Sequence, residues 1–476
     1  MSRAQTILGP ILNPRADGTV EFIPDGAMSG DDSGKIDYIG PAATLPKSLA
    51  RGERSRTASS RPQRRTDNVI TPPFLDAHIH IPQHPIRGRF VEGVGGNPPE
   101  GRLIAGLNRN VFPAEARCAD PHVAQQVVDT FLADTLANGV VGGSAYMTTH
   151  VAAAGVALER LPKAWSVGLV LMNQNCPPAL CTDEAALDAA VKELAEDFGN
   201  RFIVTDRFAV AVSTPLRKRA VALAAKHGLR MQTHLNEQLR EKQLVETTLY
   251  PEYANYTDVY RRDGLLDRDP ILAHCVRMSD EEFDVIAEKR SCVAHCPTSN
   301  TLLGSGIMPL DEVVSRGIDY SICTDVGASP TVSILAEMAQ FLKVQAGRSR
   351  YATPSEALFR ATLAPARIMH LDREIGSFAI GKPLSFIEIA CGPIPPVART
   401  DDVVLMLLGR PAVTTLLRGA LDELQRAGLD AGPALGLVER DVNDTAISLE
   451  SHVRRVTLAG DVVYNRPTPP GGSDHA

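Results

Sequence analysis

The chain has 476 residues, of which 44% are hydrophobic and 22% are charged, and its formal net charge is −7. A chain of this length and composition is expected to form a globular protein with one large core plus a smaller unit, or two ordinary domains. The slightly acidic balance argues against nucleic acid or an anionic membrane as a partner.

The N-terminal segment and the cysteines favour a cytoplasmic location. The first residues, Met1–Gln5, lack the charged and then apolar pattern of a signal peptide. No apolar run approaches the roughly 20 residues that a membrane-spanning helix needs. The eight cysteines are irregularly spaced without a Cys-x-x-Cys motif, so we expect reduced thiols.

Two kinds of strand pattern follow one another along the chain. The first 68 residues contain short β segments at Gln5–Leu12, Val20–Ile23 and Lys35–Ile39. From residue 69, apolar runs typical of buried parallel strands alternate with amphipathic helical stretches. There are eight such runs: Val69–His80, Gly139–Met147, Trp165–Met172, Phe202–Val212, Leu229–His234, Pro270–His274, Ser291–His295 and Ile318–Thr324. Eight strand–helix units in about 300 residues predict an α/β protein with a (β/α)8 TIM-type barrel.

The barrel rhythm stops after Ile375, where Ser385–Ala390 and Val453–Tyr464 again resemble strands. We therefore expect a small β-sandwich domain formed from both termini, with the barrel inserted between them. The predicted boundaries are 1–68 for the N-terminal part, 69–375 for the barrel and 376–476 for the C-terminal part. Residues 400–440 look helical and form an insertion in the C-terminal part to which we assign no function.

Polar side chains recur where the predicted barrel strands end, which is where barrels of this kind carry their chemistry. His78 and His80 alternate on the first strand, so both imidazoles lie on one face. The fifth strand ends near His234, the sixth at His274 and the eighth at Asp325. His78, His80, His234 and Asp325 offer three imidazoles and a carboxylate, which suit Zn²⁺ or Fe²⁺.

Some of these residues have structural alternatives. His234 alone could be a core histidine, and Asp325 could cap the helix that begins near Val332. The coincidence of all four residues at ordered strand ends favours the metal site. His295, which ends the seventh strand, could act directly or could support its loop through Asn300.

The neighbouring residues suggest roles in a hydrolysis. A metal ion lowers the pKa of a bound water towards 7, and Asp325 could accept the proton of that water. Glu237, three residues after His234, could transfer the proton to a ring nitrogen and to a leaving amine. His274 would orient the attacking group and stabilise the developing charge.

These residues resemble the amidohydrolase superfamily. The fourth strand ends in Thr205-Asp206-Arg207-Phe208 without a lysine, which is typical of the mononuclear deaminase branch rather than of members with two metal ions. Within that branch the chain is similar to the guanine deaminases over most of its length. The motifs that carry this resemblance are Asp76–Gln83, Val111–Glu115, Val204–Phe208, Gln232–Glu237, His295–Asn300 and Thr324–Val326.

The resemblance implies one Zn²⁺, with Fe²⁺ as the alternative, and hydrolysis of guanine to xanthine and ammonia, usually by a homodimer. It also implies that Gln83 and Arg207 bind the polar edge of the purine, that Phe208 packs on the ring and that Glu237 contacts the substrate. The alternative for Arg207 is a structural ion pair with Asp206 or with a neighbouring loop.

Three departures from the guanine deaminase pattern bear on the substrate. The stretch after Gln83 reads His84–Arg89, Gly106–Asn110 contains no tryptophan, and Val326–Pro330 replaces the usual pair of glycines. A pterin, a modified purine or an s-triazine, from which chloride could leave, therefore remains an alternative substrate. A non-catalytic scaffold is a further alternative, which the complete set of ligands and proton-transfer residues argues against.

Overall fold

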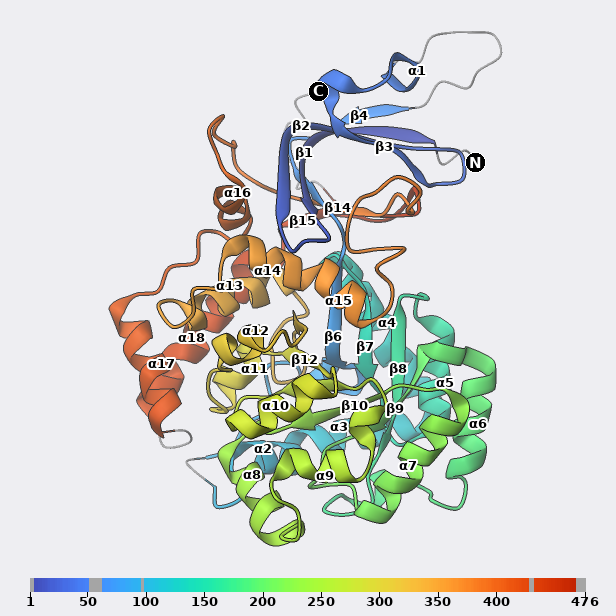
Figure 1. Ribbon diagram of the computed structural model, residues 1–476, viewed down its shortest axis with the longest axis vertical. Coiled ribbons are helices and arrows are strands. Elements are labelled where there is room, and N and C mark those ends of the chain that lie inside the picture. Colours follow the sequence, from blue (N-terminus) through green and yellow to red (C-terminus); the bar gives the residue numbers. More distant parts are fainter. Residues whose placement is uncertain (1–3, 51–61, 96–97, 428–431, 468–476) are drawn as a thin grey trace.

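The computed structural model describes residues 4–50, 62–95, 98–427 and 432–467 (Figure 1). One of its two sheets contains eight parallel strands that pair in sequence order, which confirms the predicted barrel. Hydrogen bonds from Asp325 N to His78 O and from His80 N to Val326 O join the end of the first strand to the segment after the eighth. The strands are β6 (Phe74–His80), β7 (Val140–Tyr146), β8 (Trp165–Leu171), β9 (Phe202–Asp206), β10 (Met231–Leu235), β11 (Ile271–His274), β12 (Cys292–His295) and β13 (Tyr320–Ile322).

Helices follow the barrel strands and surround them (Figure 1). Local signals fix their starts: Asp120 caps α4, and Ser279 with Glu282 forms a capping box at α10. The longer helices are α4 (Pro121–Ala137), α5 (Val151–Arg160), α6 (Leu187–Phe198), α7 (Thr214–His227), α10 (Asp280–Glu288) and α13 (Ile334–Gln345). Shorter ones are α1 (Lys47–Ala50), α2 (Arg102–Gly106), α3 (Phe112–Ala116), α8 (Leu239–Leu244), α9 (Tyr256–Arg262), α11 (Pro297–Leu302), α12 (Leu310–Ser315), α14 (Pro354–Ala361) and α15 (Leu363–Ile368).

The second sheet gathers strands from both ends of the chain, as expected for the small β domain. Its order is β16-β15-β14-β5-β1-β2-β3, and β4 also pairs with β1. The strands are β1 (Gln5–Pro14), β2 (Val20–Gly30), β3 (Ile36–Pro41), β4 (Gln63–Arg65), β5 (Val69–Thr71), β14 (Phe386–Ile389), β15 (Val453–Leu458) and β16 (Asp461–Asn465). The exact domain boundaries, 1–68, 69–375 and 376–476, stay a prediction.

Two predicted strands are each divided in the structure. The run Val69–His80 becomes β5, in the terminal sheet, and β6, in the barrel, with Pro72 and Pro73 between them. Proline has no N–H group to donate, so the two residues interrupt the strand. The run Val453–Tyr464 becomes the antiparallel pair β15 and β16, which turns at Ala459 and Gly460, both with positive φ.

The helical pattern at 400–440 is confirmed as α16 (Thr400–Leu407), α17 (Thr415–Ala427) and the start of α18 (Gly432–Leu449). Leu421 of α17 and Val438 of α18 are buried in one apolar cluster with Val344 of α13. The insertion therefore packs on the outside of the barrel.

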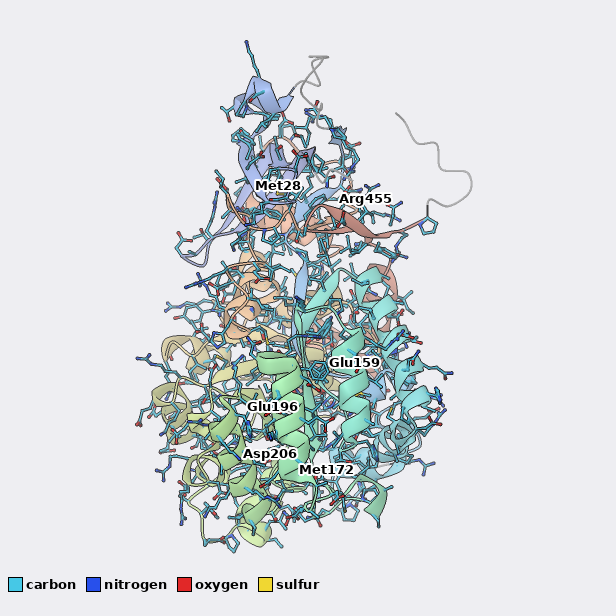
Figure 2. All side chains as sticks on the ribbon, turned by 90° about the vertical axis from the view of Figure 1, so that its right-hand side faces the viewer. Met28, Glu159, Met172, Glu196, Asp206 and Arg455 are labelled. Atoms are coloured by element: carbon cyan, nitrogen blue, oxygen red, sulfur yellow. The ribbon has the colours of Figure 1, made fainter. Side chains whose placement is uncertain are left out.

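The carboxyl ends of the barrel strands point away from the terminal sheet. In Figure 2, Met172 and Asp206, at the ends of β8 and β9, lie in the lower half of the molecule, whereas Met28 and Arg455 of the terminal sheet lie at the top. None of the described helices is long and apolar enough to cross a membrane.

Close packing of β6 against β7 can be tested at Gly143. A Cβ atom at this position would lie 1.8 Å from the backbone oxygen of Asp76, two residues before His78. We expect Gly143→Ala to lower the free energy of unfolding by about 3 kcal/mol, measured by urea denaturation. Gly155→Ala, on α5 with nothing within 4 Å of its Cβ position, is the matched control and should be neutral or stabilising. Equal stability of the two variants would contradict this packing.

Candidate metal centre

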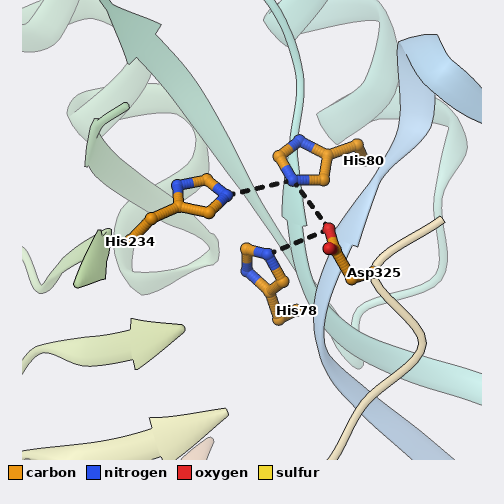
Figure 3. Close-up of side chains that lie close together, drawn as sticks. All are labelled: His78, His80, His234 and Asp325. Carbon is orange, nitrogen blue, oxygen red and sulfur yellow. Dashed lines mark hydrogen bonds and ion pairs between the residues drawn. The ribbon is translucent and has the colours of Figure 1, made fainter. Parts of the chain in front are cut away.

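Four side chains converge at the carboxyl end of the barrel (Figure 3). Asp325 Oδ1 lies 3.2 Å from His78 Nε2 and 3.1 Å from His80 Nε2. His234 Nε2 lies 3.3 Å from His80 Nε2. The four potential ligand atoms all lie within 4.8 Å of one another. The structure therefore brings together the four residues that the sequence predicts as metal ligands.

The orientation of His234 is set by its backbone neighbour. His234 Nδ1 lies 2.5 Å from the carbonyl oxygen of Arg207, which can only accept a hydrogen bond. The proton is thereby held on Nδ1, and Nε2 presents its lone pair to the other three residues. His78 Nε2 is buried and has no hydrogen-bond partner among the described residues. Such an unsatisfied nitrogen, aimed at a carboxylate, fits a cation between them.

The charges of the four side chains also suit a divalent cation. Burial lowers the pKa of His78 to about 4 and also lowers the pKa values of His80 and His234. Although burial opposes it, the close contacts of Asp325 with the imidazoles of His78 and His80 hold the pKa of Asp325 well below its usual range. At neutral pH the set thus consists of three neutral imidazoles and one carboxylate, the forms that bind metal.

Asp76 ties the first barrel strand to the eighth. Its carboxylate accepts hydrogen bonds from the backbone N–H of His78 and from both the N–H and the hydroxyl of Thr324. Burial raises the pKa of Asp76 to about 7 despite these bonds. Asp76 therefore fixes the backbone at His78, on the first strand, and at Thr324, directly before Asp325.

Glu237 lies beside the four ligands in a buried environment. Its Oε2 is 3.4 Å from His274 Nε2, and its Oε1 accepts a hydrogen bond of 3.0 Å from the Ser305 hydroxyl. Burial, together with the charge of Asp325, raises the pKa of Glu237 to about 8. Glu241 accepts the backbone N–H of Glu237 at 3.0 Å and so holds the loop. A carboxyl group with such a pKa can both give and take a proton near neutrality.

His274 is held through its other ring nitrogen. Nδ1 lies 2.9 Å from Asn300 Oδ1, while Nε2 faces Glu237 and lies 3.9 Å from Asp325 Oδ2. His295 lies outside the four-ligand set: neither of its ring nitrogens has a hydrogen-bond partner in the described part of the chain, and its ring packs against Phe341. Asn300 thus supports His274 rather than the ring of His295.

The candidate substrate residues line the same cavity, whose empty space, open in part to solvent, is about 340 Å³. Gln83, Arg207 and Phe208 face it beside Glu237 and His274. The rest of the wall is apolar and is formed by Phe90, Leu103, Leu107 and Leu303. A planar ring with one polar edge would suit such a lining.

The structure adds Glu115, to which the sequence assigned no role although one of the resemblance motifs ends at it. This carboxylate is fully buried and accepts a 3.0 Å hydrogen bond from Gln83 Nε2. Arg207 Nη1 donates to both of its oxygens, at 2.8 and 2.6 Å. Of the ion pairs considered for Arg207, the one with Asp206 is not formed, and Asp206 pairs with Arg217. The buried ion pair that Arg207 does form is with Glu115, on another segment. The role of Glu115 is visible only from its contacts with Gln83 and Arg207, which lie far from it in the sequence. The spacing of residues along the chain therefore could not predict this role.

Metal retention tests the four-ligand set. We expect His234→Ala to lower the zinc that co-purifies with the protein from about one ion per chain to below about 0.1, since three ligands hold the ion poorly. His295→Gln is the matched control, because His295 is a buried histidine at the end of another barrel strand, outside the four-ligand set, and its replacement should leave the zinc content unchanged. Elemental analysis after gel filtration measures both. Wild-type zinc content in His234→Ala would contradict the assignment.

Comparisons with known proteins agree with this geometry. The family model described as the amidohydrolase family matches residues 69–419. The guanine deaminase of Escherichia coli is 30% identical over 397 residues, which cover 81% of this chain and 86% of that protein. The probable guanine deaminase of Deinococcus radiodurans is 32% identical over 377 residues, covering 76% of this chain and 82% of that protein. The solved structure of the Escherichia coli enzyme superposes with a TM-score of 0.74 at 25% identity, covering 98% of this chain and 99% of that one. The chain therefore belongs to the amidohydrolase family, and within it to the guanine deaminase-like proteins.

Proposed function

We propose that this protein is a metal-dependent aminohydrolase that converts guanine and water to xanthine and ammonia. The observation that carries this proposal is that one cavity is lined both by candidate metal ligands and by Gln83 and Arg207. Relatives named as guanine deaminases, at about 30% identity over most of the chain, support the same reaction and the same substrate.

We infer that His78, His80, His234 and Asp325 would hold a single Zn²⁺, with Fe²⁺ as the alternative. When bound, such an ion polarises a water molecule and lowers its pKa towards 7. Asp206, at the end of the fourth barrel strand, is committed to the buried ion pair with Arg217. Because Asp206 is paired with Arg217, it is not free to bind a second ion, which supports one ion rather than two.

Three side chains would move the protons of the reaction. Asp325 Oδ1 faces His78 and His80, which leaves Oδ2 to accept a proton from the attacking water. Protonated Glu237 would give its proton to a ring nitrogen as water adds to the amino-bearing carbon. It would then take the remaining proton from the added hydroxyl and pass it to the departing amine, and the proton held by Asp325 would return to Glu237. The C–N bond breaks, ammonia leaves, and the carbon keeps the oxygen. His274 Nε2, between Glu237 and Asp325, would hold the water in place.

Arg207 and Gln83 would form hydrogen bonds with the polar edge of the base. Glu115 engages only Nη1 of Arg207, so the remaining N–H groups of the guanidinium can donate to carbonyl and ring-nitrogen acceptors. Gln83 is braced from the other side, because Gly327 N donates to Gln83 Oε1 at 3.4 Å. Phe208, whose ring lies 6.3 Å from that of His234, would form a wall against the ring of the base. The homodimer and the cytoplasmic location stay predictions.

Turnover of a panel of heterocycles tests the proposed reaction. We expect the zinc-loaded protein to release ammonia and xanthine from guanine in equal amounts, to lose activity after chelation and to regain it with Zn²⁺. Glu237→Gln should lower kcat by about 10²- to 10⁴-fold, because it removes the proton-transfer group. Rapid turnover of a pterin or an s-triazine without turnover of guanine would contradict the substrate and favour the alternative. Failure on every ring, with zinc bound, would instead favour a scaffold.

Glu115 can be tested as the residue that positions Arg207 and Gln83. We expect Glu115→Gln to raise KM for guanine about tenfold with a smaller change in kcat, because the buried guanidinium loses its charged partner. Zinc content should stay at the wild-type level. Glu92→Gln removes an exposed carboxylate on a segment near the cavity and should change neither constant. A fall in kcat at unchanged KM would contradict the positioning role.

A further inference from the structure

Two thiols lie close together on the loop that follows β8. The Sγ atoms of Cys176 and Cys181 are 3.1 Å apart. Cys181 is exposed and Cys176 is partly buried. Pro177 and Pro178, directly after Cys176, restrict the backbone between the two cysteines. The loop therefore holds the thiols close together, with one of them open to reagents in solution.

One side of this loop is hydrogen-bonded to the segment that follows Arg207 and Phe208. The backbone N–H groups of Asn173 and Gln174 both donate to Ala211 O, at 2.9 and 3.2 Å. The side chain of Asn175, next to Cys176, donates to Val210 O at 2.8 Å. The residues just before Cys176 are thus hydrogen-bonded to the segment that follows Arg207 and Phe208 in the wall of the cavity.

The other side of the loop lies against the helix that carries Glu115. Between the two cysteines the chain forms the 3₁₀ turn η5 (Pro178–Leu180), which contacts α3 (Phe112–Ala116). Leu180 is fully buried and anchors this turn. The loop therefore bridges the two segments whose side chains, Arg207 and Glu115, form the ion pair behind the candidate substrate site.

We propose that Cys176 and Cys181 form a reversible disulfide that couples the redox state of the thiol pool to substrate binding. The oxidant is a small-molecule disulfide of the glutathione type. The Cys181 thiolate attacks one sulfur of this disulfide and releases one thiol, which leaves a mixed disulfide on Cys181. The Cys176 sulfur then attacks Cys181 Sγ, the intramolecular S–S bond forms, and a second thiol leaves with the remaining proton. The pair of cysteines loses two electrons and two protons, which the reagent gains as two thiols.

The order of the two steps follows from the surroundings of the cysteines. Burial and the neighbouring Cys181 thiol raise the pKa of Cys176 to about 12. The exposed Cys181 is therefore the thiol that meets the oxidant, and Cys176 completes the bond from within the loop.

Oxidation should alter the cavity because the sulfurs must approach further. A disulfide bond is about 2.05 Å long, so the atoms close by about 1 Å from their separation in the structure. With Leu180 anchored and two prolines in the loop, part of this movement falls on Asn175 and Val210. We expect the candidate substrate wall to shift and affinity for the ring to fall.

The experiment uses the full zinc-loaded chain and reads bond formation and activity separately. The protein is equilibrated with reduced or oxidised glutathione, digested under non-reducing conditions and analysed by mass spectrometry. We expect a peptide linked through Cys176 and Cys181 only after oxidation. The activity readout rests on the proposed function: KM for guanine should rise at least about threefold on oxidation, with kcat within about twofold, and return with dithiothreitol.

Three variants lack the cysteine pair: Cys176→Ser, Cys181→Ser and the double variant. Each should show the KM of the reduced wild-type protein, with reduced as well as with oxidised glutathione. Cys391→Ser, a partly buried cysteine of the C-terminal part, is the matched control and should respond as the wild type does. Absence of the linked peptide would overturn the disulfide, whatever the protein turns over. A linked peptide with an unchanged KM, or an equal response in the double variant, would overturn the coupling. Lack of guanine turnover by the reduced protein counts against the proposed function alone.

Discussion

The hydrogen bonds that close the barrel are the constraint on which the candidate site depends. Asp325 N donates to His78 O at 3.0 Å, His80 N donates to Val326 O at 2.9 Å, and Asp76 accepts the hydroxyl of Thr324. These bonds place the last ligand between the first two, although nearly 250 residues separate them in the sequence. His234 then enters from β10 on the far side of the barrel. A metal site at this position is a consequence of closure, because no two adjacent strands carry all four ligands.

The buried charged side chains of the site each have a partner, which explains why the site can be both polar and rigid. An ionised group removed from water is costly unless partners satisfy it. Asp325 is satisfied by two histidines, and Glu115 by Arg207 and Gln83. Each pairing also orients the side chain that would touch the metal or the substrate. The same bonds that make burial tolerable therefore pre-organise the chemistry.

Much of the fold and the candidate ligands could be predicted because they leave local signals. Buried parallel strands are nearly continuous apolar runs, and polar residues at their ends stand out against them. Contacts between distant segments leave no such signal. The pairing of Glu115 with Arg207, and the turn that divides Val453–Tyr464 into two strands, depend on the folded chain. Asn236, His274 and Asp325 also have positive φ values, an uncommon conformation that tertiary contacts impose near the site.

We infer that one metal ion lies between His78, His80, His234 and Asp325, in the cavity that also receives the substrate. The decisive experiment is an anomalous difference map from crystals of the zinc-loaded protein, recorded at the zinc edge. We expect a single peak about 2.0–2.2 Å from Nε2 of His78, His80 and His234 and from a carboxylate oxygen of Asp325. Two peaks in the cavity, or a peak bound by other residues, would contradict it.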